Sequence, residues 1–251
     1  MFNIDEYSNS SEKYLISLRN SVIIYFGFTL TEFLLVAVLA AQLTPERIIY
    51  WTIVSNWVKI FLVLLPWAEA LRQGDLTPLE LGFGALSDAG GRRNLRQMLL
   101  LGVVLLLTVD FISILNNLLM QVLQFKIPEN TVIKLFTQGS AGIKIAVAFL
   151  ALVTAPVCEE IFFRNILFKF IRDVLCRPPD EHLDDFKRRT WIAAVGASSV
   201  FAVIHLNFYG FIPLLCLGLL FQYLFIRSKS LWPSIIIHAL NNLQALLIAF
   251  L

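Results

Sequence analysis

The sequence PVCEEIFFR, residues 156–164, places two glutamates and an arginine inside an apolar run that covers residues 145–170. Burying one charged side chain in hydrocarbon costs about 2.5 to 3.5 kcal/mol on insertion scales, so such groups need a partner or a task. On a helix, Glu160 and Arg164 are four residues apart and can pair on one face. Glu159 points roughly 100° away from that pair. The sequence therefore predicts one anchored carboxylate and one that faces another part of the chain.

The composition of the 251-residue chain, 58% hydrophobic and 15% charged, is typical of a membrane protein. Several apolar runs approach the roughly 20 residues that a bilayer-spanning helix needs. The fold class we predict is all-α, a polytopic transmembrane helix bundle of about seven spans, within a range of about six to eight. The predicted spans cover residues 21–43, 50–71, 98–122, 143–170, 191–205, 211–226 and 231–251. Interfacial segments are expected at residues 1–20, 79–86 and 124–142.

Charge and cysteine content exclude some classes of protein. A formal net charge of +2 is too small to argue for nucleic acid as a partner. The three cysteines form no CxxC pair, and an odd number argues against a disulfide framework. Membrane lipid is the partner that the composition implies.

The twenty Lys and Arg residues are spread unevenly over the predicted loops. Fourteen lie in the tail and in the loops after the second, fourth and sixth spans, and two lie within spans. The four on the opposite side are Arg47, Lys126, Lys134 and Lys144. By the positive-inside rule, we expect a multi-pass protein of a prokaryotic plasma membrane, with its amino terminus in the cytoplasm and its carboxyl terminus outside.

Further polar residues recur at helical spacing in the last third of the chain. Phe201 and His205 are four apart in the fifth predicted span, and His238 and Asn242 are four apart in the seventh. Each pair projects from one helix face. One interpretation is a hydrogen-bond network that only holds helices together. The concentration of two histidines, two carboxylates and an amide on three helices favours a reactive site instead.

These residue types suit two kinds of chemistry. A carboxylate and an imidazole can activate a shared water as general base, and a histidine and an asparagine can donate to an oxyanion. That combination predicts amide hydrolysis without a covalent intermediate. Glu159, His205 and His238 could also form a three-ligand zinc site. The absence of an HExxH motif, and the better fit of Asn242 as an oxyanion donor, make zinc the weaker interpretation, so we expect no cofactor.

Four other charged residues lie singly within the predicted spans, and we expect packing or snorkelling to account for them. They are Glu32, Lys59, Glu69 and Asp110. Small residues on the fifth span, Ala193, Ala194, Ala197 and Ser198, predict close packing of that helix against the helix of the glutamates.

The three motifs, Glu159-Glu160-x-x-x-Arg164, Phe201-x-x-x-His205 and His238-x-x-x-Asn242, resemble in order those of the CPBP intramembrane endopeptidases. That family includes CAAX prenyl proteases and bacteriocin-processing or self-immunity enzymes. The resemblance covers residues 143–251, which we interpret as the catalytic helices. Residues 1–142 carry the tail, the first three spans and interfacial segments, and hold no motif.

The resemblance implies a role for each motif residue. Glu159 and His205 would activate the water, His238 and Asn242 would form the oxyanion hole, and Glu160 and Arg164 would support the site. The implied activity is that of a glutamic intramembrane endopeptidase acting on a peptide or lipidated protein, of the prenylated CAAX type or a leader-peptide precursor. Two other functions stay open: a non-proteolytic scaffold, regulatory or immunity protein of the same family, and, more weakly, a transporter with a buried proton relay.

The depth of His205 conflicts with a simple layout. Glu159 lies about 15 Å before the cytoplasmic end of its span, whereas His205 lies about 22 Å beyond Thr190 at that same side. We therefore expect the fifth helix to begin outside the hydrocarbon and its link to the sixth to turn within the protein.

Overall fold

A computed structural model describes residues 12–39, 42–72, 82–83, 95–126, 131–175 and 183–249, and every regular element in these ranges is a helix. The α-helices are α1 (Glu12–Leu39), α2 (Pro45–Arg72), α3 (Leu95–Val122), α4 (Thr131–Gln138), α5 (Ala141–Phe149), α6 (Ala155–Glu160), α7 (Phe168–Phe170), α8 (Leu183–Ile204), α9 (Phe211–Ser228) and α10 (Trp232–Ile248). Three π-helical segments, η3 (Leu150–Thr154), η4 (Ile161–Leu167) and η5 (Ile171–Leu175), join α5, α6 and α7 into one continuous helix, here called the glutamate helix. The predicted all-α fold is confirmed.

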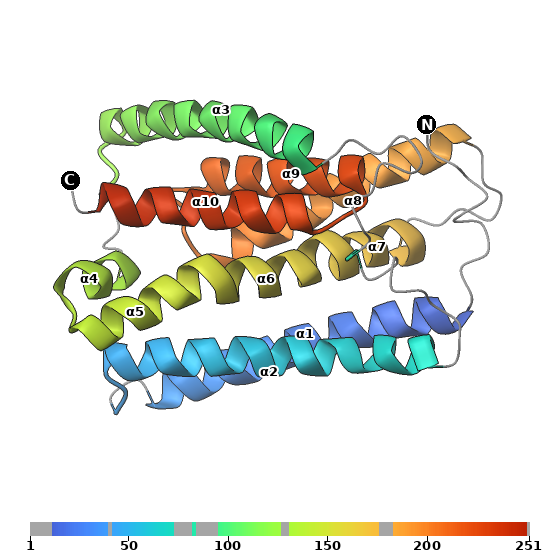
Figure 1. Cartoon of the computed structure of the whole chain (residues 1–251), viewed down its shortest axis with the longest axis horizontal. Helices are drawn as coiled ribbons and strands as arrows, with labels where there is room; N and C mark the ends of the chain where they lie inside the picture. Colours follow the sequence, from blue (N-terminus) through green and yellow to red (C-terminus); the bar gives the residue numbers. More distant parts are fainter. Residues whose placement is uncertain are drawn as a thin grey trace.

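The long helices lie side by side along the longest axis of the molecule, and α1, α2 and α3 alternate in direction (Figure 1). Among the described residues, five segments are long and apolar enough to cross a membrane: Tyr14–Leu39, Pro45–Glu69, Leu95–Val122, Ala141–Leu175 and Phe211–Ser228. They correspond to the first four predicted spans and the sixth. The fifth and seventh predicted spans fall on α8, whose first turns are charged, and on α10, which has 17 residues. The multi-pass bundle is therefore supported, while the count of seven spans stays a prediction.

The predicted interfacial segments are only partly described. Residues 12–20 continue into α1, so that helix begins earlier than the predicted span at residue 21. Within residues 124–142 a short helix, α4, is present. Of the segment 79–86, only Gly82 and Phe83 belong to the described residues. Gly82 has a φ of +79° and its carbonyl accepts a hydrogen bond from the Leu231 amide at 2.7 Å, which ties this connection to the start of α10.

Helix α8 is displaced along the bundle in the way that the depth argument predicts. Figure 1 shows its first turns extending past the end of α10, and its connection to α9 lying short of the opposite end that α3 and α10 reach. The connection is a tight turn in which Leu206 has a φ of +50° and the Gly210 amide donates to the Asn207 side chain at 3.0 Å. This displacement brings the end of α8 to the level of the glutamates.

Small residues let α8 approach α9 closely, whereas the sequence predicts close packing of this helix against the glutamate helix. Helix α8 also contacts the glutamate helix, where the Phe201 and Phe163 ring centres are 5.3 Å apart. Ala193, Ala194, Ala197 and Ser198 are all buried. A Cβ atom added at Gly218 of α9 would lie 2.9 Å from the Ser198 Cβ, so glycine is required at this crossing. The main core packs around the glutamate helix, where residues 161–169 are buried without a break.

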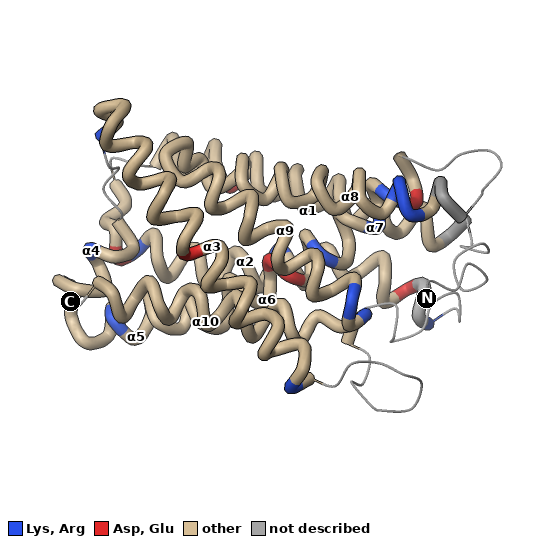
Figure 2. Tube along the Cα trace, turned by 90° about the horizontal axis from the view of Figure 1, so that it is seen from above, with Lys and Arg blue, Asp and Glu red and all other residues tan. Residues whose placement is uncertain are grey.

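Lys and Arg residues gather towards the two ends of the bundle, as Figure 2 shows. At one end, Arg72 closes α2, Arg227 lies in the last turn of α9, and Lys187 lies near the start of α8. At the other end, Lys134 lies on α4 and Lys144 on α5. This distribution fits the predicted charge asymmetry, and the orientation in a membrane stays a prediction.

The charges within the first three spans are not single, contrary to the sequence-based interpretation. Lys59 Nζ lies 3.1 Å from a Glu32 carboxylate oxygen, which joins α2 to α1. Asp110 on α3 accepts a hydrogen bond from Gln244 on α10 at 3.0 Å. Because the partners in each pair come from different helices, no spacing within one helix predicts these pairs.

Candidate active site

The anchored carboxylate predicted from sequence is present in the glutamate helix. Glu160 Oε2 lies 3.0 Å from Arg164 Nε, and both side chains have no exposed surface. The Arg164 guanidinium lies over three rings, with its carbon 4.7 Å from the centre of Phe201, 5.6 Å from Phe221 and 5.8 Å from Phe163. A buried carboxylate is tolerated when such a paired cation compensates its charge.

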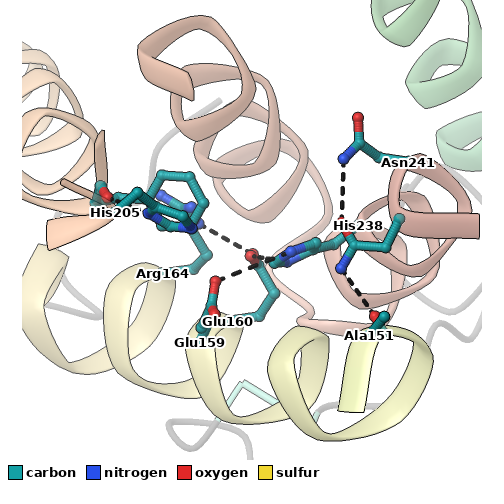
Figure 3. A network of polar contacts seen from close by, with 9 residues as sticks. Ala151, Glu159, Glu160, Arg164, His205, His238 and Asn241 are labelled. Atoms are coloured by element: carbon teal, nitrogen blue, oxygen red, sulfur yellow. Dashed lines mark hydrogen bonds and ion pairs between the residues drawn. The ribbon is translucent and has the colours of Figure 1, made fainter. Parts of the chain in front are cut away.

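The other oxygen of Glu160 holds His238 of α10. His238 Nδ1 lies 3.0 Å from Glu160 Oε1, and its ring stacks on Phe221 with centroids 4.8 Å apart and planes 16° apart. Figure 3 shows Glu160 between Arg164 on one side and His238 on the other. Since the carboxylate can only accept, Nδ1 is the donor, and Nε2 of the neutral ring is left as an acceptor.

Glu159 is the less buried of the two glutamates, with 23% of its side chain exposed. Its Oε2 lies 3.9 Å from His238 Nε2 and has no hydrogen-bond partner in the described part of the chain. The free carboxylate therefore faces an imidazole whose opposite nitrogen is fixed by the anchored carboxylate.

His205 directly follows the last residue of α8 and contacts Phe201 of that helix, and its role in activating water stays a prediction. Its Nδ1 lies 2.6 Å from the carbonyl oxygen of Phe201, on its own helix, and its ring centre is 4.5 Å from the Phe201 ring. No ion pair or hydrogen bond joins it to Glu159 within the residues that the structure describes. In the view of Figure 3, His205 lies on the Arg164 side of the network. Phe201 is the common neighbour, since its ring centre is also 6.3 Å from that of His238.

Asn242 is fixed by a backbone carbonyl that the glutamate helix leaves open. The Ala155 amide donates to Leu150 instead of Ala151, which is the π-helical pattern. The next residue, Pro156, has no N–H to offer. The Ala151 carbonyl instead accepts from Asn242 Nδ2 at 2.8 Å. One proline in the apolar run thus determines where Asn242 is held.

Asn241, which sequence reasoning did not select, orients the Asn242 amide from the other side. Its Nδ2 lies 3.2 Å from Asn242 Oδ1. Because an amide nitrogen carries two hydrogens, Asn242 keeps one N–H beyond its bond to Ala151. The adjacency of two asparagines in an apolar helix is the only sequence signal for this contact.

Comparison with known proteins concerns the region that holds these residues. Residues 141–244 match the family model described as type II CAAX prenyl endopeptidase Rce1-like, and all seven residues of the three motifs lie within the match. This region, less than half of the chain, is therefore similar to the CAAX proteases. The match implies CAAX-type intramembrane protease activity in general terms. No curated protein and no solved structure matches the chain.

The metal interpretation concerns Glu159, His205 and His238. Among the described residues, no group of three or more His, Cys, Asp and Glu side chains is arranged to hold a metal ion. Of the three candidate zinc ligands, Glu159 lies 3.9 Å from His238, whereas His205 contacts Phe201. Catalysis without zinc stays a prediction.

Tyr25 of α1 is a further residue that packs on the glutamate helix and that sequence reasoning missed. Its ring stacks on Phe162, with the ring centres 3.3 Å apart. A single tyrosine in an apolar span has no spacing signal that could have selected it.

Proposed function

We propose that the chain is an intramembrane endopeptidase that hydrolyses a peptide bond of a prenylated CAAX-type or leader-peptide substrate, with Glu159 as general base. The observation that carries this proposal is the placement of His238 between the two glutamates. The buried Glu160 fixes its Nδ1, and its Nε2 faces the partly exposed Glu159. One carboxylate is thereby reserved for orientation and the other for proton transfer.

A separation of 3.9 Å between Glu159 Oε2 and His238 Nε2 is too long for a hydrogen bond and suits a bridging water. Both atoms are acceptors, so such a water donates one hydrogen to each and keeps its lone pairs for attack. In this assignment His238 takes the water-binding position that the family resemblance gives to His205. In this assignment His205 contacts the reacting groups only when substrate is bound, because catalytic hydrogen bonds often tighten in the complex.

In the proposed reaction Glu159 first accepts a proton and then returns it. As the water oxygen bonds to the carbonyl carbon, one water proton passes to Glu159 and the carbonyl oxygen becomes an oxyanion. The carbon–nitrogen bond then breaks, and Glu159 returns the proton to the leaving nitrogen, which leaves as an amine while the other product is a carboxylic acid. The remaining N–H of Asn242 is a donor for the oxyanion.

The decisive experiment offers prenylated CAAX peptides and leader-peptide precursors to the purified protein in liposomes. Glu159→Gln keeps the shape but removes the base, so turnover should fall by about 10²- to 10⁴-fold while the amount of folded protein is unchanged. Glu69→Gln is the matched control, because Glu69 lies at the exposed end of α2 and pairs with Arg72. His238→Ala should cost more turnover than His205→Ala.

Two results count against the proposal. Equal turnover by E159Q and the parent on every substrate that is cut would exclude the glutamate mechanism. If the parent cuts nothing while it binds these substrates, the non-proteolytic scaffold is the better description.

A further inference from the structure

The turn between α8 and α9, which begins directly after His205, has little packing of its own. Leu206 and Phe208 are 67% and 85% exposed. The Asn207 side chain is used within the turn, where it accepts a hydrogen bond from the Gly210 amide at 3.0 Å. Burial of these side chains therefore does not fix the level of the turn along the bundle.

Asn116 of α3 holds this turn from a third helix. Its Nδ2 donates to the Tyr209 carbonyl oxygen at 2.9 Å, and only 4% of the residue is exposed. Within the described residues, this is the one hydrogen bond between the turn and a helix other than α8 and α9. Burying an amide in an apolar helix is costly without such a partner. Asn117, the next residue, is exposed, and its side chain has no hydrogen bond in the same part of the chain.

Helix α3 is itself fixed against α10, the helix that carries His238. A Cβ atom added at Gly102 of α3 would lie 2.5 Å from the Ile237 side chain of α10, so the two helices are in close contact there. Further along α3, the Asp110 carboxylate accepts from the Gln244 amide of α10 at 3.0 Å. Helix α3 is therefore a common reference for α10 and for the turn between α8 and α9.

The ring of His205 is oriented by its own helix, whereas its level in the bundle is not. Its Nδ1 lies 2.6 Å from the Phe201 carbonyl oxygen. Since a carbonyl can only accept, Nδ1 is the donor and Nε2 of the neutral ring is an acceptor. This bond moves with α8, so it does not determine where Nε2 lies relative to Glu159 and a bound substrate. That distance depends on where α8 ends.

We propose that Asn116 is a positioning residue for His205. Its bond to the Tyr209 carbonyl fixes the turn to α3, and so fixes the level at which His205 Nε2 meets the reacting groups when substrate binds. A misplacement of about 1 Å can cost a catalytic site about 10²-fold in rate. This inference rests on the proposed function and adds a residue from a helix that carries no family motif.

Asn116→Ala tests the inference, because it removes the bond to the turn and leaves every motif residue in place. Turnover should fall by about 10- to 100-fold with KM unchanged, since the loss is one of alignment and not of substrate binding. Asn117→Ala is the matched control: it removes an adjacent asparagine on the same helix that has no side-chain hydrogen bond in the described part of the chain. Its turnover should equal that of the parent. An N116A variant with parental turnover, or with only a raised KM, overturns the inference.

A double variant shows whether Asn116 acts through His205. If it does, Asn116→Ala should cost less than about threefold in a His205→Ala background, because the residue that it positions is already gone. A loss that comes only from a weakened fold would be carried over in full. Equal costs in the two backgrounds therefore overturn the inference.

A measurement on the substrate-free protein does not depend on turnover. The chain has three histidines, so nitrogen NMR of histidine-labelled protein gives few signals, and H205A assigns those of His205. Asn116→Ala should shift the ring resonances of His205 and leave those of His238 in place, and Asn117→Ala should shift neither. Unmoved His205 resonances in N116A, or equal shifts of both histidines, overturn the inference.

The two measurements separate failure of the inference from failure of the proposed function. Parental turnover by N116A while E159Q is inactive removes only the role of Asn116. A parent that cuts nothing removes the proposed function, whereas a shift of the His205 resonances in N116A still supports the coupling of Asn116 to His205.

Discussion

Two of the ion pairs within the membrane-spanning segments differ in how they are built. Glu160 and Arg164 belong to one helix, have no exposed surface and hold His238. Glu32 and Lys59 come from two helices, and their side chains are 17% and 7% exposed. The first pair follows from a spacing of four in the sequence, and the second follows only from the packing of α1 on α2. A pair within a helix orients a site, whereas a pair between helices joins two elements.

The largest expected effect is on the pair within the helix. Glu160→Gln leaves Arg164 without a counter-charge in a fully buried setting, which typically costs about 3 to 5 kcal/mol. It also releases His238 Nδ1, so turnover and the amount of folded protein should both fall. Thermal unfolding in detergent together with the cleavage assay checks this. A stable E160Q with parental turnover would show that the pair has no orienting role.

A smaller loss is expected for the pair between helices. Lys59→Met leaves Glu32 with the Ser55 hydroxyl and partial exposure, so we expect a destabilisation of about 1 to 3 kcal/mol in thermal unfolding. Adding Glu32→Gln should recover part of that loss, because the stranded charge is then removed. The contrast between the pairs fails if K59M is as unstable as E160Q, or if the second substitution brings no recovery.

The smallest effect is expected where no charge is involved. Pro156→Ala restores an N–H that can compete with Asn242 for the Ala151 carbonyl, so Asn242 should be held less firmly. Turnover should fall about tenfold, less than the roughly 10²-fold loss of an oxyanion donor, while thermal stability is retained. Pro66→Ala on α2, another proline within a helix, is the control and should keep parental turnover. A P156A variant that loses stability but not turnover would contradict this account of Asn242.

The sequence predicts what depends on neighbouring positions of one helix. The different roles of Glu159 and Glu160, the Arg164 pair and the close packing of α8 follow from spacing and residue size. The contacts of His205 and Asn242 do not follow from spacing. They depend on where α8 ends and on which backbone carbonyl has no backbone donor. The Glu32–Lys59 pair and Tyr25 were missed for the same reason: their partners lie on other helices, and no short-range pattern records them.

The π-helical segments also determine what the deletion of one residue from the glutamate helix does to the site. A π turn is equivalent to one residue inserted into an α-helix. Deleting one residue within Leu150–Thr154 would rotate everything before it by about 100° relative to the two glutamates. Ala151 and the Asn242 contact would then turn away from His238. Sequence alignment of this protein with a relative whose helix is purely α-helical therefore requires a one-residue gap at each π turn.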